Sequence, residues 1–199
     1  YDIVVPEIKV KQMFPKGLNI VFAGNIGVAQ SFDTIISAVK IVSQKIENFT
    51  ILVLGDGRDK KRILNKINSL NLNNQFKFLG SFPPEKMPHF FASADALLVS
   101  LKKTKIFSMT IPGKLQSYLA CGRPIIASLD GIGAEIIKES SCGYVSPSED
   151  YKGLAKSIIK LSNSTEEKRA NFGINARKYF DNEFSRDKLL IRLIDIFEK

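Results

Sequence analysis

The sequence predicts an α/β fold, a Rossmann-like, doubly wound parallel sheet with a helical C-terminal tail. Short apolar runs alternate with amphipathic segments of helical period, which is the order expected of parallel βαβ units. The apolar runs are almost continuous, as is typical of strands that helices cover on both faces. Three runs end directly before a glycine, at Gly24, Gly55 and Gly80, where a tight turn can lead into the next helix.

Each expected element follows from this alternation. The six expected strands lie at residues 18–23, 50–54, 76–79, 96–100, 124–127 and 143–145. Helices are expected at 33–46, 58–70, 84–92, 112–120 and 134–139, and from about residue 149 onward with breaks near 162–165 and 182–185. Residues 1–18 contain two prolines and three lysines, so we expect an irregular lead-in or linker before a domain at 19–199.

Composition narrows the classes of function. A chain of 199 residues can bury a core without disulfides or metals, but it is too short for an enzyme that needs two full-sized domains. His89 is the only histidine, which excludes histidine-based metal sites and a Ser-His-Asp triad from this chain, and no metal is expected. Two cysteines, with no secretory signal or membrane-spanning run, indicate a cytoplasmic protein. The net charge of +9 is spread over both halves, and we expect anionic small molecules rather than nucleic acid as partners.

Ligands of doubly wound sheets bind beyond the carboxyl ends of the strands. The first loop there holds Gly24, Asn25 and Gly27, where a ligand can approach the backbone and an anion can meet the next helix. The spacing is G-x-x-G rather than G-x-G-x-x-G, which argues against an NAD-dependent oxidoreductase. The alternative is a tight turn without a ligand.

The second loop begins at Gly55 and leads to Arg58 and Lys61 in the opening turns of a helix. Their charge suits a phosphate, although residues 58–62 also fit a solvated helical face.

The third loop, residues 110–114, is the best phosphate candidate by its expected geometry. Pro112 presets the first turn of a helix, and Gly113 removes side-chain bulk beside the free N–H groups. The backbone of Thr110 and Ile111 and the ammonium of Lys114 would then face an anion. The alternative is ordinary helix initiation with Lys114 in solvent.

Several segments stand in a recognisable order. They are FLGSF at 78–82, ADALLVS at 94–100, YLACGRPIIA at 118–127 and AEIIKESSCGYVSP at 134–147. In this order they resemble the carboxyl-terminal, donor-binding domain of family-4, or group 1, glycosyltransferases of the GT-B fold, over about residues 19–190. The GNIG run at 24–27 and the IPGK run at 111–114 further resemble a branch that acts in bacterial surface-polysaccharide and amino-sugar transfer.

The resemblance implies a domain that binds a nucleotide-diphosphate sugar, a UDP-sugar, for retaining hexosyl or N-acetylhexosaminyl transfer to a polysaccharide or lipid-linked acceptor. Phe82 would border the nucleobase. The N-terminal domain of such enzymes supplies the acceptor site and most catalytic groups, so no catalytic residue is assigned and the isolated chain is expected to be inactive. Residues 1–18 would then be the interdomain linker.

The resemblance also identifies departures from the family pattern. The arginine and lysine that clamp the diphosphate in the family would fall at Asn25 and Gln30, and its paired glutamates at Met109 and Ser117. Lys114 is expected to supply the missing positive charge, with the backbone N–H groups of 110–113. Ser117 can reach a ribose hydroxyl, whereas Met109 cannot bond a sugar in the way a glutamate does.

Two alternatives stay open. A nucleotide-sugar epimerase shares the fold, but it needs acids and histidines across its cleft, and this chain offers few. The other is a non-catalytic nucleotide-binding module. The positive charge also suits an anionic membrane surface, so a peripheral position on the inner face of the membrane is a further expectation.

Overall fold

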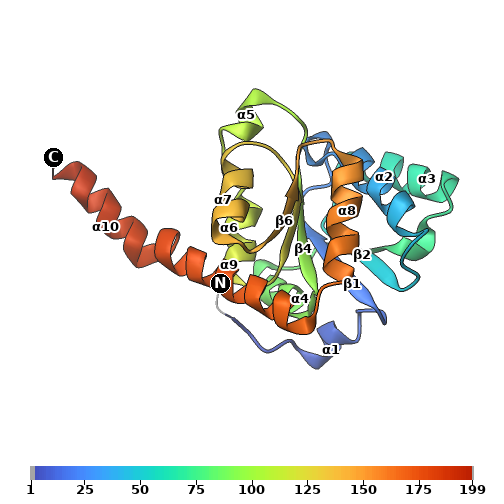
Figure 1. Ribbon diagram of the computed structural model, residues 1–199, viewed down its shortest axis with the longest axis horizontal. Helices are drawn as coiled ribbons and strands as arrows, with labels where there is room; N and C mark the ends of the chain where they lie inside the picture. Colours follow the sequence, from blue (N-terminus) through green and yellow to red (C-terminus); the bar gives the residue numbers. More distant parts are fainter. Residues whose placement is uncertain (1–2, 199) are drawn as a thin grey trace.

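A computed structural model describes residues 3–198, and the parts of the expected ranges at residues 1, 2 and 199 lie outside it. Six parallel strands form one sheet in the order β3-β2-β1-β4-β5-β6, which confirms the doubly wound α/β fold (Figure 1). The strands are β1 Leu18–Ala23, β2 Phe49–Leu54, β3 Phe76–Gly80, β4 Ala96–Ser100, β5 Ile125–Ser128 and β6 Gly143–Ser146. The direction of winding reverses between β1 and β4, which makes their carboxyl ends the expected place for a ligand.

Two hydrophobic cores form, one on each face of the sheet. The helices on one face are α2 Phe32–Val42, α3 Lys60–Ser69 and α8 Tyr151–Ser162. The helices on the other are α4 Met87–Ser93, α6 Gly113–Ala120, α7 Ile132–Ser140 and α9 Glu166–Glu183. Neighbouring residues of β1 bury their side chains on opposite faces, Ile20 and Phe22 on one and Val21 on the other, so an almost continuous apolar run serves both cores.

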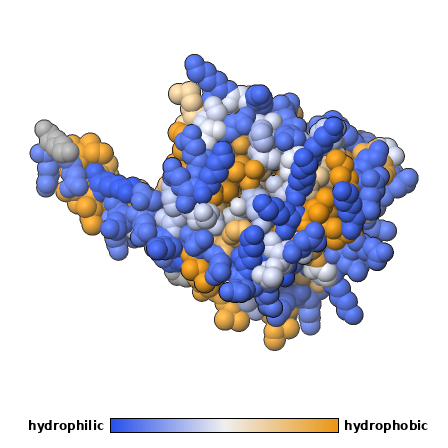
Figure 2. Space-filling view, viewed as in Figure 1, coloured by the Kyte–Doolittle hydropathy of each residue, from blue (hydrophilic) through white to orange (hydrophobic). Residues whose placement is uncertain are grey.

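The last helix, α10 Arg186–Phe197, projects from the body (Figure 1). None of its residues, all of them described, is buried, and apolar side chains lie exposed among its charged ones (Figure 2). Within residues 3–198, no helix combines the length and apolar character needed to cross a membrane.

The lead-in differs from the irregular segment that the sequence predicted. Residues Ile8–Lys11 form a single turn, α1, whose Val10 is buried against the core beside α4. The Glu7 carboxylate holds this segment to the turn before α4 through Lys86 Nζ at 2.7 Å. A single turn has no hydrophobic period, so sequence patterning could not reveal it.

Other differences are small. A second single turn, α5 Lys105–Ser108, is capped at its N-terminus by Thr104, whose hydroxyl accepts a hydrogen bond from the Phe107 N–H. Helix α2 ends at Val42, before the polar turn at 43–46. The breaks expected in the C-terminal tail are present.

Tyr118 connects the α6 layer to the sheet. Its side chain is fully buried, and its hydroxyl accepts a hydrogen bond of 2.9 Å from the Ala23 N–H at the end of β1. Tyr118→Phe leaves this buried N–H without a partner, so we expect the free energy of unfolding to fall by about 1–3 kcal/mol. Chemical denaturation measures the change. Tyr151→Phe, at an exposed tyrosine, is the control, and an equal effect of the two substitutions would contradict the assigned bond.

Candidate functional site

A cavity of about 430 Å³ lies at the carboxyl edge of the sheet, beside the switch point. The loops after β1, β2 and β3 form one side, and α4 and α6 form the other. Its lining residues are Ala23, Gly24, Asn25, Leu54, Gly55, Asp56, Ser81, Phe82, Met87, Phe91, Lys114, Ser117 and Tyr118. Apolar groups therefore make up much of its wall, and Lys114 is the one cationic side chain that residues 3–198 contribute to it.

Close backbone packing forms one side of the cavity. The Gly24 N–H donates to the Leu54 carbonyl, and the Gly55 N–H donates to the Gly80 carbonyl. Gly55 has φ +132°, and a Cβ atom there would lie 2.1 Å from the Gly24 carbonyl oxygen. Only glycine fits at Gly55, because both the dihedral and the space exclude a side chain.

Lys114 places a cationic side chain in this largely apolar cavity. Its Nζ donates a hydrogen bond of 2.6 Å to Gln30 Oε1 and lies 4.0 Å from the centroid of the Phe22 ring. Burial lowers the pKa of Lys114 to about 7, and in the described part of the chain no carboxylate forms an ion pair with it. Lys114 is only partly exposed, and an ammonium shielded from water without a counter-ion is costly, so an anion that entered the cavity would be stabilised there.

The first loop divides between two hollows. Gly24 and Asn25 line the cavity, and Asn25 also borders a neighbouring hollow of about 510 Å³ together with Gly27 and Arg58. Arg58 lines only the neighbouring hollow, which Lys114 does not line, and Lys61 is exposed and lines neither hollow. The cations of the second loop are therefore not gathered with Lys114.

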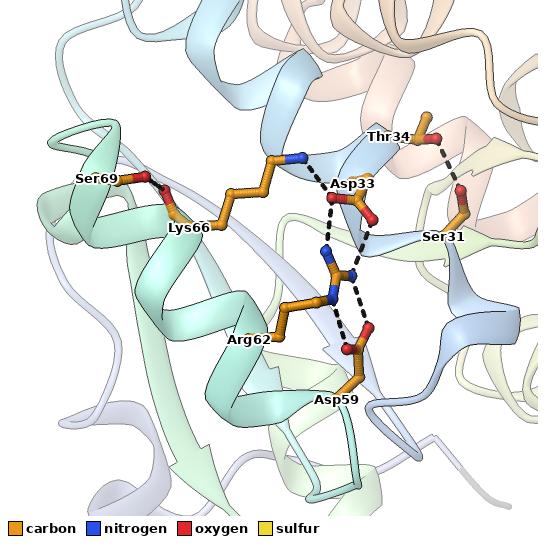
Figure 3. A network of polar contacts seen from close by, with 7 residues as sticks. All are labelled: Ser31, Asp33, Thr34, Asp59, Arg62, Lys66 and Ser69. Atoms are coloured by element: carbon orange, nitrogen blue, oxygen red, sulfur yellow. Dashed lines mark hydrogen bonds and ion pairs between the residues drawn. The ribbon is translucent and has the colours of Figure 1, made fainter.

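The charges that follow Arg58 hold helices together (Figure 3). Arg62, on α3, bridges Asp33 on α2 and Asp59, with N–O distances of 2.9 and 2.6 Å, and Lys66 also pairs with Asp33. The hydrogen bond from Arg62 is the main cause that lowers the pKa of Asp33 to about 2. This network fixes α3 against α2, as the surface alternative for residues 58–62 implied.

Helix α6 presents only part of the third loop to the cavity. Lys114 and Ser117 lie on the helix face that lines it, as the i, i+3 spacing requires. Gly113 is exposed at the first turn, and the hydroxyl of Thr110 donates to the Ile106 carbonyl. Ile111 packs against the core, so residues 110, 111 and 113 contribute no side chain to the lining.

Phe82 lines the cavity and packs on Phe90, with ring centroids 4.5 Å apart. Two other apolar lining residues, Met87 and Phe91, come from α4, and the sequence indicated neither as a site residue. Met109, which falls where the family has a glutamate, is 63% exposed and does not line the cavity.

The histidine and the two cysteines lie outside the lining of the cavity. His89 Nδ1 lies 3.2 Å from the Val5 carbonyl oxygen, and Cys121 and Cys142 are free and buried, with pKa values raised to about 11 by burial. Among residues 3–198, no three His, Cys, Asp or Glu side chains gather as metal ligands would.

Asp56 is the one carboxylate that the described residues place in the lining. The Gly57 N–H and Lys60 lower its pKa, and its side chain is largely exposed.

Solved structures of similar shape include a glycosyltransferase from Rickettsia africae and the C-terminal domain of a glycosyl transferase group 1 family protein from Francisella tularensis. Anabaena Alr3699/HepE, solved in complex with UDP, has a TM-score of 0.83 and 18% identity over 96% of this chain and 51% of that protein. A point mutant of S. aureus TarM, solved with fondaparinux, alpha-GlcNAc-glycerol and UDP, has a TM-score of 0.78 and 18% identity over 93% of this chain and 37% of that protein. At these identities the likeness shows the fold.

Sequence relatives agree. Probable glycosyltransferase WbjE of Pseudomonas aeruginosa is 30% identical over 79% of this chain and 37% of its own length. N-acetyl-alpha-D-glucosaminyl L-malate synthase of Bacillus anthracis is 27% identical over 83% of this chain and 41% of its own length. The chain thus spans less than half the length of these relatives. The family model for glycosyl transferases group 1 matches residues 5–179, and the chain belongs to this glycosyltransferase family.

Proposed function

We propose that this chain is the donor-binding domain of a retaining glycosyltransferase that takes a hexosyl or N-acetylhexosaminyl group from a UDP-sugar. The observation that carries the proposal is the Lys114 amine, which lies in an apolar cavity at the switch point without a carboxylate partner among the described residues. Family membership supports sugar transfer, and UDP in the complexes of HepE and TarM supports the choice of nucleotide.

Different residues of the chain bind different parts of the donor. The diphosphate meets Lys114 and the first N–H groups of α6, where the helix dipole favours negative charge. The nucleobase lies against Phe82 and the neighbouring Met87 and Phe91, and Ser117 donates or accepts a hydrogen bond at the ribose. The missing side chain of Gly24 leaves room beside the Lys114 amine, where the diphosphate would approach the backbone.

The same proposal includes an acceptor and an N-terminal domain as further partners of this domain. An N-terminal domain covers the carboxyl edge and supplies the acceptor site, which the greater length of the relatives supports. The acceptor is a polysaccharide or a lipid-linked sugar. A lipid-linked acceptor places the enzyme at the inner face of the membrane, where a net charge of +9 favours anionic lipids.

A non-catalytic nucleotide-binding module is the second candidate, because Asp56 is the only carboxylate of the described lining and is held by Lys60. It would bind the nucleotide without sugar transfer by the whole protein.

UDP should stabilise the domain against heat. A ligand at 100 times its dissociation constant contributes about 2.7 kcal/mol, which for a chain of this size raises Tm by about 5–10 °C. Differential scanning fluorimetry with UDP, other nucleoside diphosphates and uridine measures the shift. If no nucleoside diphosphate changes Tm at millimolar concentration, the donor-site proposal is wrong.

UDP affinity should also depend on pH. The pKa of Lys114 is about 7 in the free protein, and a bound diphosphate stabilises the ammonium, so binding takes up a proton. The association constant should therefore fall about fifteenfold between pH 7 and 8.5, with a slope that approaches tenfold per pH unit at the upper end. Asp56 and Tyr118 are the other titratable side chains of the lining, and neither changes charge in this range.

Calorimetric titration measures this profile. Lys114→Gln should bind UDP more weakly and lose the dependence on pH, while uridine binding by either protein should be flat. A wild-type profile for UDP that does not change from pH 7 to 8.5 would contradict the role of Lys114.

A further inference from the structure

We propose that Gln30 is a positioning residue that fixes the Lys114 amine at the donor diphosphate. The site then needs one positive charge at this point, and a lysine at position 30 or at position 114 can supply it. The inference rests on the proposed function, because it concerns how this site binds its anion. The two residues are 84 positions apart in sequence, and a hydrogen bond of 2.6 Å joins Gln30, in the segment after β1, to Lys114 on α6.

The backbone of Gln30 is itself fixed. It ends the one-turn helix η1 Val28–Gln30, and its N–H donates to the Gly27 carbonyl at 3.0 Å. The next residue, Ser31, is buried in the left-handed region at φ +48°, and its hydroxyl pairs with Thr34. Gln30 therefore approaches Lys114 from a rigid segment.

The bond to Gln30 is the only hydrogen bond that Lys114 Nζ makes to the described residues. Phe22 occupies one side of the amine, and Gly24 leaves space on another, because a Cβ there would lie 3.3 Å from Nζ. One donor is held by Gln30 Oε1, and an ammonium has two more N–H groups for a ligand.

The residue type at position 30 sets the charge of the site. A glutamine oxygen accepts from Lys114 and adds no charge, so the pair carries one positive charge when Lys114 is protonated. A glutamate at 30 would pair with Lys114 and cancel the charge, and a lysine would add a second cation beside the first. With lysine at 30 and glutamine at 114, the positive charge stands at nearly the same point.

Calorimetry with UDP and uridine tests this arrangement on five variants. Lys114→Gln and Gln30→Glu should each lower UDP affinity at least tenfold at pH 7, with uridine affinity within twofold of wild type. The double variant Lys114→Gln with Gln30→Lys should regain most of the lost UDP affinity. Gln30→Met, which removes the acceptor at similar volume, should weaken UDP several-fold. Gln116→Met, on α6 but outside the lining, is the matched control and should bind as wild type.

Uridine binding reports whether each variant keeps its fold. A double variant no better than Lys114→Gln, with uridine affinity intact, would overturn the inference. If the double variant does not fold, Gln30→Glu and Gln30→Met decide: wild-type UDP affinity in both overturns the inference, and selective loss of UDP supports it. Absence of nucleotide binding by the wild-type protein would instead refute the proposed function. If Lys114→Gln loses UDP binding while the Gln30 variants bind UDP as the wild type does, the proposed function stands and the role of Gln30 is refuted.

Discussion

A lysine amine held in an apolar cavity, with no carboxylate partner among the described residues, is the constraint on which the site depends. Lys114 lies on α6, donates a hydrogen bond to Gln30 and packs over the Phe22 ring, so three parts of the chain together fix the position of its amine. Burial favours the neutral amine, and an anion favours the ammonium. A ligand that brings negative charge would resolve this conflict, and the diphosphate of the proposed donor is such a ligand.

The rest of the domain serves this position. The parallel sheet brings the loops after β1, β2 and β3 to one edge, and Gly55 lets two of these loops pack backbone to backbone. Tyr118 ties α6 to the end of β1, one turn beyond Lys114. The Arg62 network fixes α3 to α2. Most of the other cationic side chains form ion pairs or lie exposed away from the cavity. The net charge of +9 is therefore carried mainly by the surface and not by the site.

Much of the fold could be predicted from the sequence, because apolar runs and helical periods repeat over many residues. The single turns α1 and α5 could not, since one turn has no period, and Val10 is the only residue by which α1 reaches the core. The loops that form the cavity were also predictable, because parallel strands end at one edge. What the sequence could not show was which side chains in those loops converge: Arg58 faces another hollow, while Phe91 and Met87 reach the cavity from α4. The Gln30–Lys114 contact joins distant segments, and its geometry depends on how η1 and α6 pack.

The most direct measurement is the number of protons exchanged when UDP binds. Calorimetric titrations at pH 8 in buffers of different ionisation enthalpy give this number without any assumption about affinity. With a free-state pKa of about 7 for Lys114 and a higher value in the complex, the wild-type protein should take up close to one proton, and Lys114→Gln none. No uptake by the wild-type protein, or the same uptake by both proteins, would contradict the account.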